Sequence, residues 1–144
     1  MGDEPATKES HTDAIVELLF GLTERVRVHS EIIAGEFDLP LAQAAALLHL
    51  RDPIPMSELA TALTCDRSNI TGIIDRLEER GLVERLTDAA DRRVKQLVLT
   101  RAGHRMRDRL HTRLYGDLLH TPGVTADLAS LGELLATADG AAPQ

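Results

Sequence analysis

Apolar positions in the first quarter of the chain recur at helical spacing. Ser10 and Asp13 form the pattern of a helix start, a hydroxyl followed three residues later by a carboxylate. Two rows then repeat every seven residues and form one stripe: Ile15, Leu22 and His29, and Leu19, Val26 and Ile33. The pattern predicts a disordered N-terminus over residues 1–9 and a helix of about seven turns over residues 10–37. A compact monomer of this size cannot bury so long a stripe alone, so we expect a partner helix from a second subunit.

Short helical patterns separated by turn residues follow. In chain order they predict a helix, a loop, a helix, a tight turn and a helix: Leu41–Leu50, Arg51–Pro55, Met56–Leu63, Thr64–Asp66 and Arg67–Arg80. The last of these helices has one apolar side, formed by Ile70, Ile73, Ile74 and Leu77. Gly81 has the chemistry of a residue that ends a helix with a positive φ.

The period then changes to that of short strands. Leu82–Leu86 and Lys95–Thr100 are joined by the polar loop Thr87–Arg93, and such a hairpin must lean on helices to be stable. Two further helices are predicted, over Arg101–Leu119 and from Val124 onward, before a loose tail at residues 140–144. The fold class is therefore mostly α with a small β-hairpin wing. We expect a winged helix-turn-helix over residues 38–100, and helices for dimerisation over residues 10–37 and 101–139.

Charge is unevenly distributed along the chain. The 144 residues carry a net charge of −7. Between Arg51 and Arg113, 13 basic residues face 10 acidic ones, whereas the remainder holds 3 basic and 13 acidic residues. A basic segment in an acidic body is typical of a surface that binds a polyanion. The N-terminus has no apolar signal region and no segment is long enough for a membrane span, so we expect a cytoplasmic protein with no membrane partner.

The helix that begins at Arg67 carries the residues expected to read DNA. Polar side chains gather near its start, and one more lies further along the same helix: Arg67, Ser68, Asn69 and Thr71, with Arg76. Arginine and asparagine match the edges of guanine and adenine, and the N-terminal residues of such a helix enter the major groove. The free N–H groups of the helix start also suit phosphate. Gly72 removes a side chain where the helix approaches either the core or a duplex closely.

The hairpin loop supplies the second expected contact. Arg92 and Arg93 lie at its end. An arginine on a thin hairpin is able to enter a narrow minor groove, where the negative potential is strongest. The two clusters of arginines would therefore bracket one duplex, and the acidic bulk of the chain would stay away from it.

The segment SELATALTCDRSNITGIIDRLEERGLVERLTDAADRRVKQLVLTRAG resembles the winged-helix core of the MarR family of bacterial transcriptional regulators. The pieces in register are Leu59-Ala60, Asp75–Glu78, Gly81–Val83, Arg85, Asp91–Arg93 and Leu99–Gly103. The wing departs from the pattern at Ala89-Ala90, where a proline is common. The resemblance implies a homodimer that reads a pseudo-palindrome, and an ion pair between Asp75 and Arg92 or Arg93 that fixes the wing.

The resemblance also implies a ligand-responsive repressor with a small phenolic or other anionic effector. The residues expected near such a pocket are His29, His49 and Arg27, with Arg51 as a weaker candidate. For His29, a place in the dimer core is the alternative. Cys65 is expected to pack rather than react, and the histidines at 104, 111 and 120 lack the companions of a metal site.

No catalytic motif accompanies these features, so we expect no enzyme, no cofactor and no metal. The rival hypothesis is a winged-helix module that binds other proteins and does not bind DNA specifically. The basic run from Asp91 to Arg113, with 8 basic and 2 acidic residues, argues against it.

Overall fold

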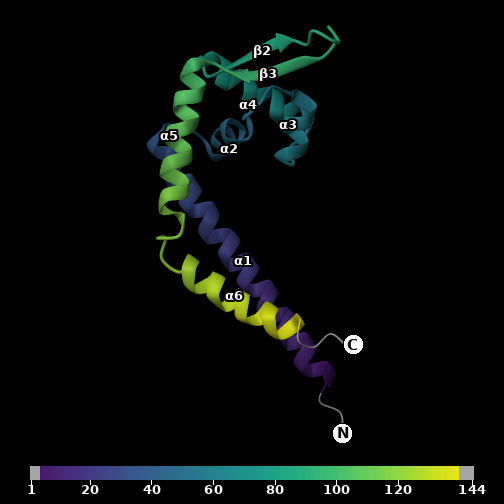
Figure 1. Cartoon of the computed structure of the whole chain (residues 1–144), viewed down its shortest axis with the longest axis vertical. Helices are drawn as coiled ribbons and strands as arrows, with labels where there is room; N and C mark the ends of the chain where they lie inside the picture. The colour runs from purple at the N-terminus through teal and green to yellow at the C-terminus, as the bar shows by residue number, and fades with distance from the viewer. Residues whose placement is uncertain (1–3, 140–144) are drawn as a thin grey trace. The chain divides into compact units, whose positions relative to one another are not determined.

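The structure is a computed structural model that describes residues 4–139. Its elements, in chain order, are α1 (Glu4–Glu36), α2 (Leu41–His49), β1 (Ile54–Pro55), α3 (Met56–Ala62), α4 (Arg67–Glu79), β2 (Val83–Thr87), β3 (Lys95–Leu99), α5 (Arg101–Leu118) and α6 (Val124–Asp139). The prediction of a mostly helical chain with a small wing is confirmed, because the strands form one antiparallel sheet in the order β1-β3-β2. We call β2, β3 and the loop between them the wing (Figure 1).

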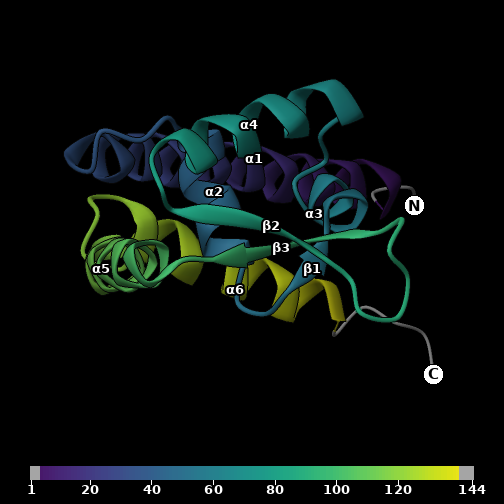
Figure 2. The same ribbon diagram turned by 90° about the horizontal axis from the view of Figure 1, so that it is seen from above.

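The chain forms two compact units, one of residues 31–114 and one of residues 1–30 with 115–144. The first unit is wider than the expected winged domain of residues 38–100. It takes in the end of α1 and most of α5, because Ile33, Ala34 and Leu110 belong to its core. Figure 2 shows this unit from above, with the wing running beside α4.

The core of unit 31–114 is built from small and branched aliphatic side chains. The fully buried ones come from helices and strands alike: Leu47, Leu50, Leu59, Ile70, Ile74, Leu77, Val83, Leu97 and Leu110. Burial of each contributes about 1.5–3 kcal/mol relative to exposure. The predicted apolar face of α4 is confirmed, although Ile73 is only half-buried. Figure 1 shows the wing lying along one side of α2, α3 and α4, which gives the hairpin the support that it needs.

Three helices of this unit end in the same way. After α1, α3 and α4, the residue in the left-handed region is Asp38 (φ 54), Thr64 (φ 52) or Gly81 (φ 69). At each end the N–H of this residue and the N–H of the next one donate to carbonyls of the last turn, as in Leu82 N to Leu77 O at 2.9 Å. The turn predicted at Thr64–Asp66 and the role predicted for Gly81 are thereby confirmed. Threonine is a strained choice for this conformation, because its branched Cβ crowds the backbone.

Thr100 and Gly103 join the wing to α5. The Thr100 hydroxyl donates to Gly81 O at 2.6 Å and accepts from Gly103 N at 3.0 Å, so one side chain caps the helix and holds the end of α4. A Cβ on Gly103 would lie 1.9 Å from Leu82 O. Only glycine permits so close an approach of the two backbones.

Two expectations about secondary structure are wrong. The segment Arg51–Pro55, expected as a loop, contributes the strand β1, which pairs Ile54 with Leu97 and makes the sheet three-stranded. Pro55 is compatible with this position because β1 is an edge strand. Helix α1 begins at Glu4, so residues 4–9 are helical rather than disordered. The expectations for residues 1–3 and for the tail at 140–144 lie outside the described residues.

The second unit holds the first part of α1 together with α6. Arg25 Nε donates to Asp127 Oδ2 at 2.8 Å, and Val124 is buried. Large apolar side chains nevertheless remain exposed here: Val16, Leu19, Phe20, Val28, Tyr115, Leu119, Leu128 and Leu135. Phe20 is 72% exposed. So many exposed apolar side chains in one unit are unusual for a monomer.

Candidate nucleic-acid interface

Asp66 caps α4 at the end that was expected to meet DNA. Its Oδ1 accepts from Asn69 N and from the Ser68 hydroxyl, both at 2.8 Å. The backbone bond from Asn69 and then the Ser68 hydroxyl hold the pKa of the Asp66 carboxyl below its usual range. The expectation of free N–H groups for phosphate is thus wrong in part, because a carboxylate of the chain already occupies this position. The signal that was missed is an aspartate directly before a helical pattern.

The polar start of α4 is exposed. Arg67, Ser68, Asn69 and Arg76 all face solvent, whereas Thr71 is half-buried. The Thr71 hydroxyl lies 2.8 Å from Arg67 O and 3.7 Å from Met56 Sδ. Thr71 is therefore the least available of the five α4 residues that were predicted to contact DNA.

Gly72 lies in open space on the same helix. A Cβ at this position would meet no neighbouring atom within 4 Å. Of the two readings that the sequence left open, close packing against the core is therefore excluded. A glycine inside an exposed helix costs about 1 kcal/mol relative to alanine, and here no contact within the chain requires it.

Arg85 on β2, rather than an arginine of the wing loop, pairs with α4. Its Nη2 donates to Asp75 Oδ1 at 2.7 Å, and its Nη1 donates to Glu78 Oε2. The predicted ion pair between Asp75 and Arg92 is therefore wrong. Arg92 is exposed on the wing loop, whose backbone has its own local order.

That order comes from Asp88 and Asp91. Asp88 Oδ1 accepts from Ala90 N at 2.7 Å, and Asp88 Oδ2 accepts from the Gln96 side chain at 2.7 Å. These bonds hold the pKa of Asp88 below its usual range, and the bond from Gln96 contributes most to this lowering. Asp91 Oδ1 accepts from Arg93 N at 3.0 Å. Two carboxylates thereby stiffen the loop on either side of Ala89-Ala90, and Arg92 and Arg93 are exposed on it.

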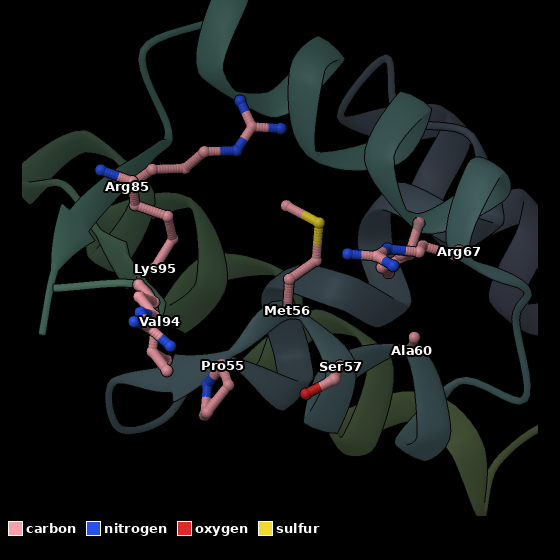
Figure 3. Close-up of a pocket in the computed structure, with 10 residues that line it drawn as sticks. Pro55, Met56, Ser57, Ala60, Arg67, Arg85, Val94 and Lys95 are labelled. Carbon is pink, nitrogen blue, oxygen red and sulfur yellow. The ribbon is translucent and has the colours of Figure 1, made fainter. Parts of the chain in front are cut away.

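A groove of about 580 Å³ lies between α4 and the wing. Its lining comes from β1, α3, α4 and the wing: Pro55, Met56, Ser57, Ala60, Arg67, Ile70, Arg85, Arg93, Val94 and Lys95. Figure 3 shows Met56 near the middle, with Arg67 on one side and Arg85 and Lys95 on the other. The groove joins the two clusters of arginines that the sequence placed at opposite ends of the same segment.

The residues expected near an effector pocket fall into different units. His29 Nδ1 lies 3.1 Å from the Thr121 hydroxyl, and Arg27 Nη2 donates to Glu24 at 2.6 Å. His49 and Arg51 are exposed and belong to unit 31–114.

Cys65 is half-buried, and its thiol lies 3.5 Å from Leu63 O. Within the described residues, no group of three or more His, Cys, Asp and Glu side chains is arranged to hold a metal ion. In the same part of the chain, no helix is both long and apolar enough to cross a membrane.

Residues 44–95 match the family model described as the MarR family. The transcriptional repressor MprA of Escherichia coli strain K12 is 49% identical over 51 residues, which are 35% of this chain and 29% of that protein. The match therefore spans less than a third of the curated relative.

Solved structures extend the likeness to most of the chain. The transcriptional repressor CouR, solved bound to a 23-mer DNA duplex, is 31% identical with a TM-score of 0.64, and the alignment covers 83% of this chain and 89% of that one. Apo MarR from E. coli is 25% identical with a TM-score of 0.69, over 85% of this chain and 93% of that one. Together with the helix α4, the wing and the match over residues 44–95, these alignments show that the chain belongs to the MarR family of transcriptional regulators.

Proposed function

We propose that the chain binds double-stranded DNA in a sequence-specific manner, with α4 in the major groove and the wing in the adjacent minor groove. The observation that carries this proposal is the pair of exposed basic clusters on one compact unit, Arg67 on α4 and Arg92 with Arg93 on the wing. Helix-turn-helix proteins use the start of the second helix for base contacts. The DNA-bound state of the relative CouR supports the same role for this unit.

The residues proposed to contact DNA share exposure and polarity, apart from the half-buried Thr71: Arg67, Ser68, Asn69, Thr71, Arg76, Arg92 and Arg93. Asn69 is the strongest candidate for reading a base. Its side-chain amide is free of the bond that its backbone N–H makes to Asp66, so the cap and the reading group are separate parts of one residue.

The proposed assembly is a homodimer. The apolar side chains left exposed in the unit of residues 1–30 and 115–144, such as Phe20 and Leu128, support a partner of the same kind. A two-fold dimer presents two α4 helices and reads a pseudo-palindrome whose half-sites lie about one helical turn apart.

The proposed role is repression in the cytoplasm that a small phenolic or other anionic effector relieves. Two relatives, MprA and CouR, are transcriptional repressors, which supports the sign of the regulation. His29 and Arg27 in one unit, and His49 in the other, remain the proposed residues for the effector.

Selection from a random pool of duplexes tests the function. The purified protein should enrich one motif with inverted half-sites, and size-exclusion chromatography with light scattering should give the mass of a dimer. Enrichment of no motif by an intact dimer would contradict specific DNA binding and favour the protein-interaction module.

A further inference from the structure

Three of the four cations that line the groove between α4 and the wing have no carboxylate partner among the described residues. Arg85 is neutralised, because both Asp75 and Glu78 accept from it. The other three cations that line the groove are Arg67, Arg93 and Lys95. Within the described residues, none of these three forms an ion pair, and Lys95 Nζ donates only to the Thr87 hydroxyl at 2.9 Å. The groove therefore has a local excess of positive charge, because within the described residues no carboxylate pairs with these three cations.

Half of the residues that line the groove are apolar, and we call them its apolar floor: Pro55, Met56, Ala60, Ile70 and Val94. Such a lining fits a ligand with one anionic group attached to a ring or a carbon skeleton. A deoxyribose phosphate has this chemistry, with the phosphate between the cations and the sugar against the apolar floor.

The position of the groove selects the source of that ligand. The major and minor grooves of a duplex are separated by the backbone of one strand. A protein with α4 in one groove and the wing in the next must therefore pass this backbone between the two elements. The space between α4 and the wing is the groove that Arg67, Arg93 and Lys95 line (Figure 3).

We propose that this groove binds a phosphodiester of the strand between the two grooves, through Arg67, Arg93 and Lys95. The inference rests on the proposed function and adds two assignments to it. Lys95, which no sequence motif singled out, contacts DNA. Arg67 anchors the backbone rather than reading a guanine, which leaves base reading to Ser68, Asn69 and Arg76.

The first test compares variants that change one charge. Lys95→Gln and Arg67→Gln should each weaken binding to the selected duplex and to a scrambled duplex by the same factor. Each should lower the slope of log K against log salt by about 1.8, because the proposed dimer loses one phosphate contact, which contributes about 0.9, in each of its two half-sites. Lys95→Arg should keep the wild-type slope. Arg101→Gln is the matched control, because Arg101 is exposed at the start of α5 and does not line the groove.

The second test locates the phosphate. Uncharged methylphosphonate linkages are placed in turn at matching positions of both half-sites of the selected duplex. The proposal predicts one linkage, or two adjacent ones, at which Lys95→Gln causes no further loss of affinity. The thermal midpoint of each variant, expected within a few degrees of wild type, separates a lost contact from a lost fold.

An unchanged salt slope in both glutamine variants, or an equal loss at every methylphosphonate position, would overturn the groove assignment while leaving DNA binding intact. A loss for Arg67→Gln confined to the selected duplex would return Arg67 to base reading and overturn its assignment as an anchor. Absence of any salt-dependent DNA binding by the wild-type protein would instead overturn the proposed function, and the groove assignment with it.

Discussion

Asp75 of α4 and Arg85 of β2 are joined by a hydrogen-bonded ion pair of 2.7 Å. Glu78, one turn further along α4, accepts from the same guanidinium. One arginine of β2, between two carboxylates of α4, thus holds α4 and the base of the wing together. Any change in the direction of α4 must therefore be transmitted to the strand that carries the wing.

Replacement of Arg85 by alanine should weaken this connection. Two carboxylates on neighbouring turns would then face each other without a cation, and we expect a loss of about 1–2 kcal/mol in the free energy of unfolding, since the group is only partly exposed. Urea denaturation measures it. Asp75→Asn, which leaves the Glu78 contact in place, should cost less. A fully stable Arg85→Ala protein would show that the pair contributes nothing to the fold.

Replacement of Gly103 by alanine should be far more damaging. The added Cβ would lie 1.9 Å from Leu82 O, so α5 must move away from the end of α4. We expect a loss of at least ~3 kcal/mol, at the upper end for overpacking because the obstacle is backbone. Gly132→Ala on α6 is the control, since its Cβ would meet nothing within 4 Å. Thermal unfolding of both variants checks the contrast, and equal midpoints would contradict the close approach.

The shape of the wing loop should depend on the ionised form of Asp88. Its folded pKa is lowered, so the stabilisation is complete above the ordinary value of 3.8 and is lost as the pH falls through the lowered folded value. Asp88 therefore stays ionised near neutral pH, and changes of pH in that range should not alter the shape of the loop. Gln96→Ala removes the largest cause and should raise the pKa of Asp88 toward 3.8, as carbon-detected NMR titration of the carboxyl would report. A titration curve that Gln96→Ala does not shift would mean that the Gln96 bond is absent in solution.

Asn69→Ala should change specificity without loosening the helix. The cap depends on the backbone N–H of residue 69, which alanine retains. We expect a loss of about 1–3 kcal/mol on the selected duplex and a relaxed preference at one base pair. Competition with duplexes that carry each single-base change measures this preference. Equal losses on selected and scrambled duplexes would assign Asn69 to the backbone instead.

Local signals in the sequence were sufficient for most of the fold. The apolar face of α4 is a matter of spacing, and the end of α4 at Gly81 follows from the chemistry of one residue, so both were predicted correctly. The strand β1 was not predicted, because a segment of two residues is too short to show an alternating pattern. It forms because Leu97 of β3 lies opposite Ile54. The helical start of α1 at Glu4 likewise lacked a cap signal before Ser10.

The candidate site was predictable only in part, for the same reason. The exposed start of α4 and the arginines of the wing follow from sequence position. The partner of Asp75 depends on which side of β2 faces α4, and the pairing with Arg85 requires the assembled sheet. The groove with Lys95 joins four separate elements, so no single stretch of the sequence indicates it. Membership of a family of transcriptional regulators agrees with the expectation that the chain is not an enzyme.

The most direct test of sequence-specific DNA binding is fluorescence anisotropy of the wild-type protein on its selected duplex and on a scrambled duplex, over a series of salt concentrations. We expect binding to the selected duplex to be at least ~10³-fold tighter, with affinity for both falling steeply as salt rises. Equal affinity for the two duplexes, or an affinity that salt does not change, would contradict the account.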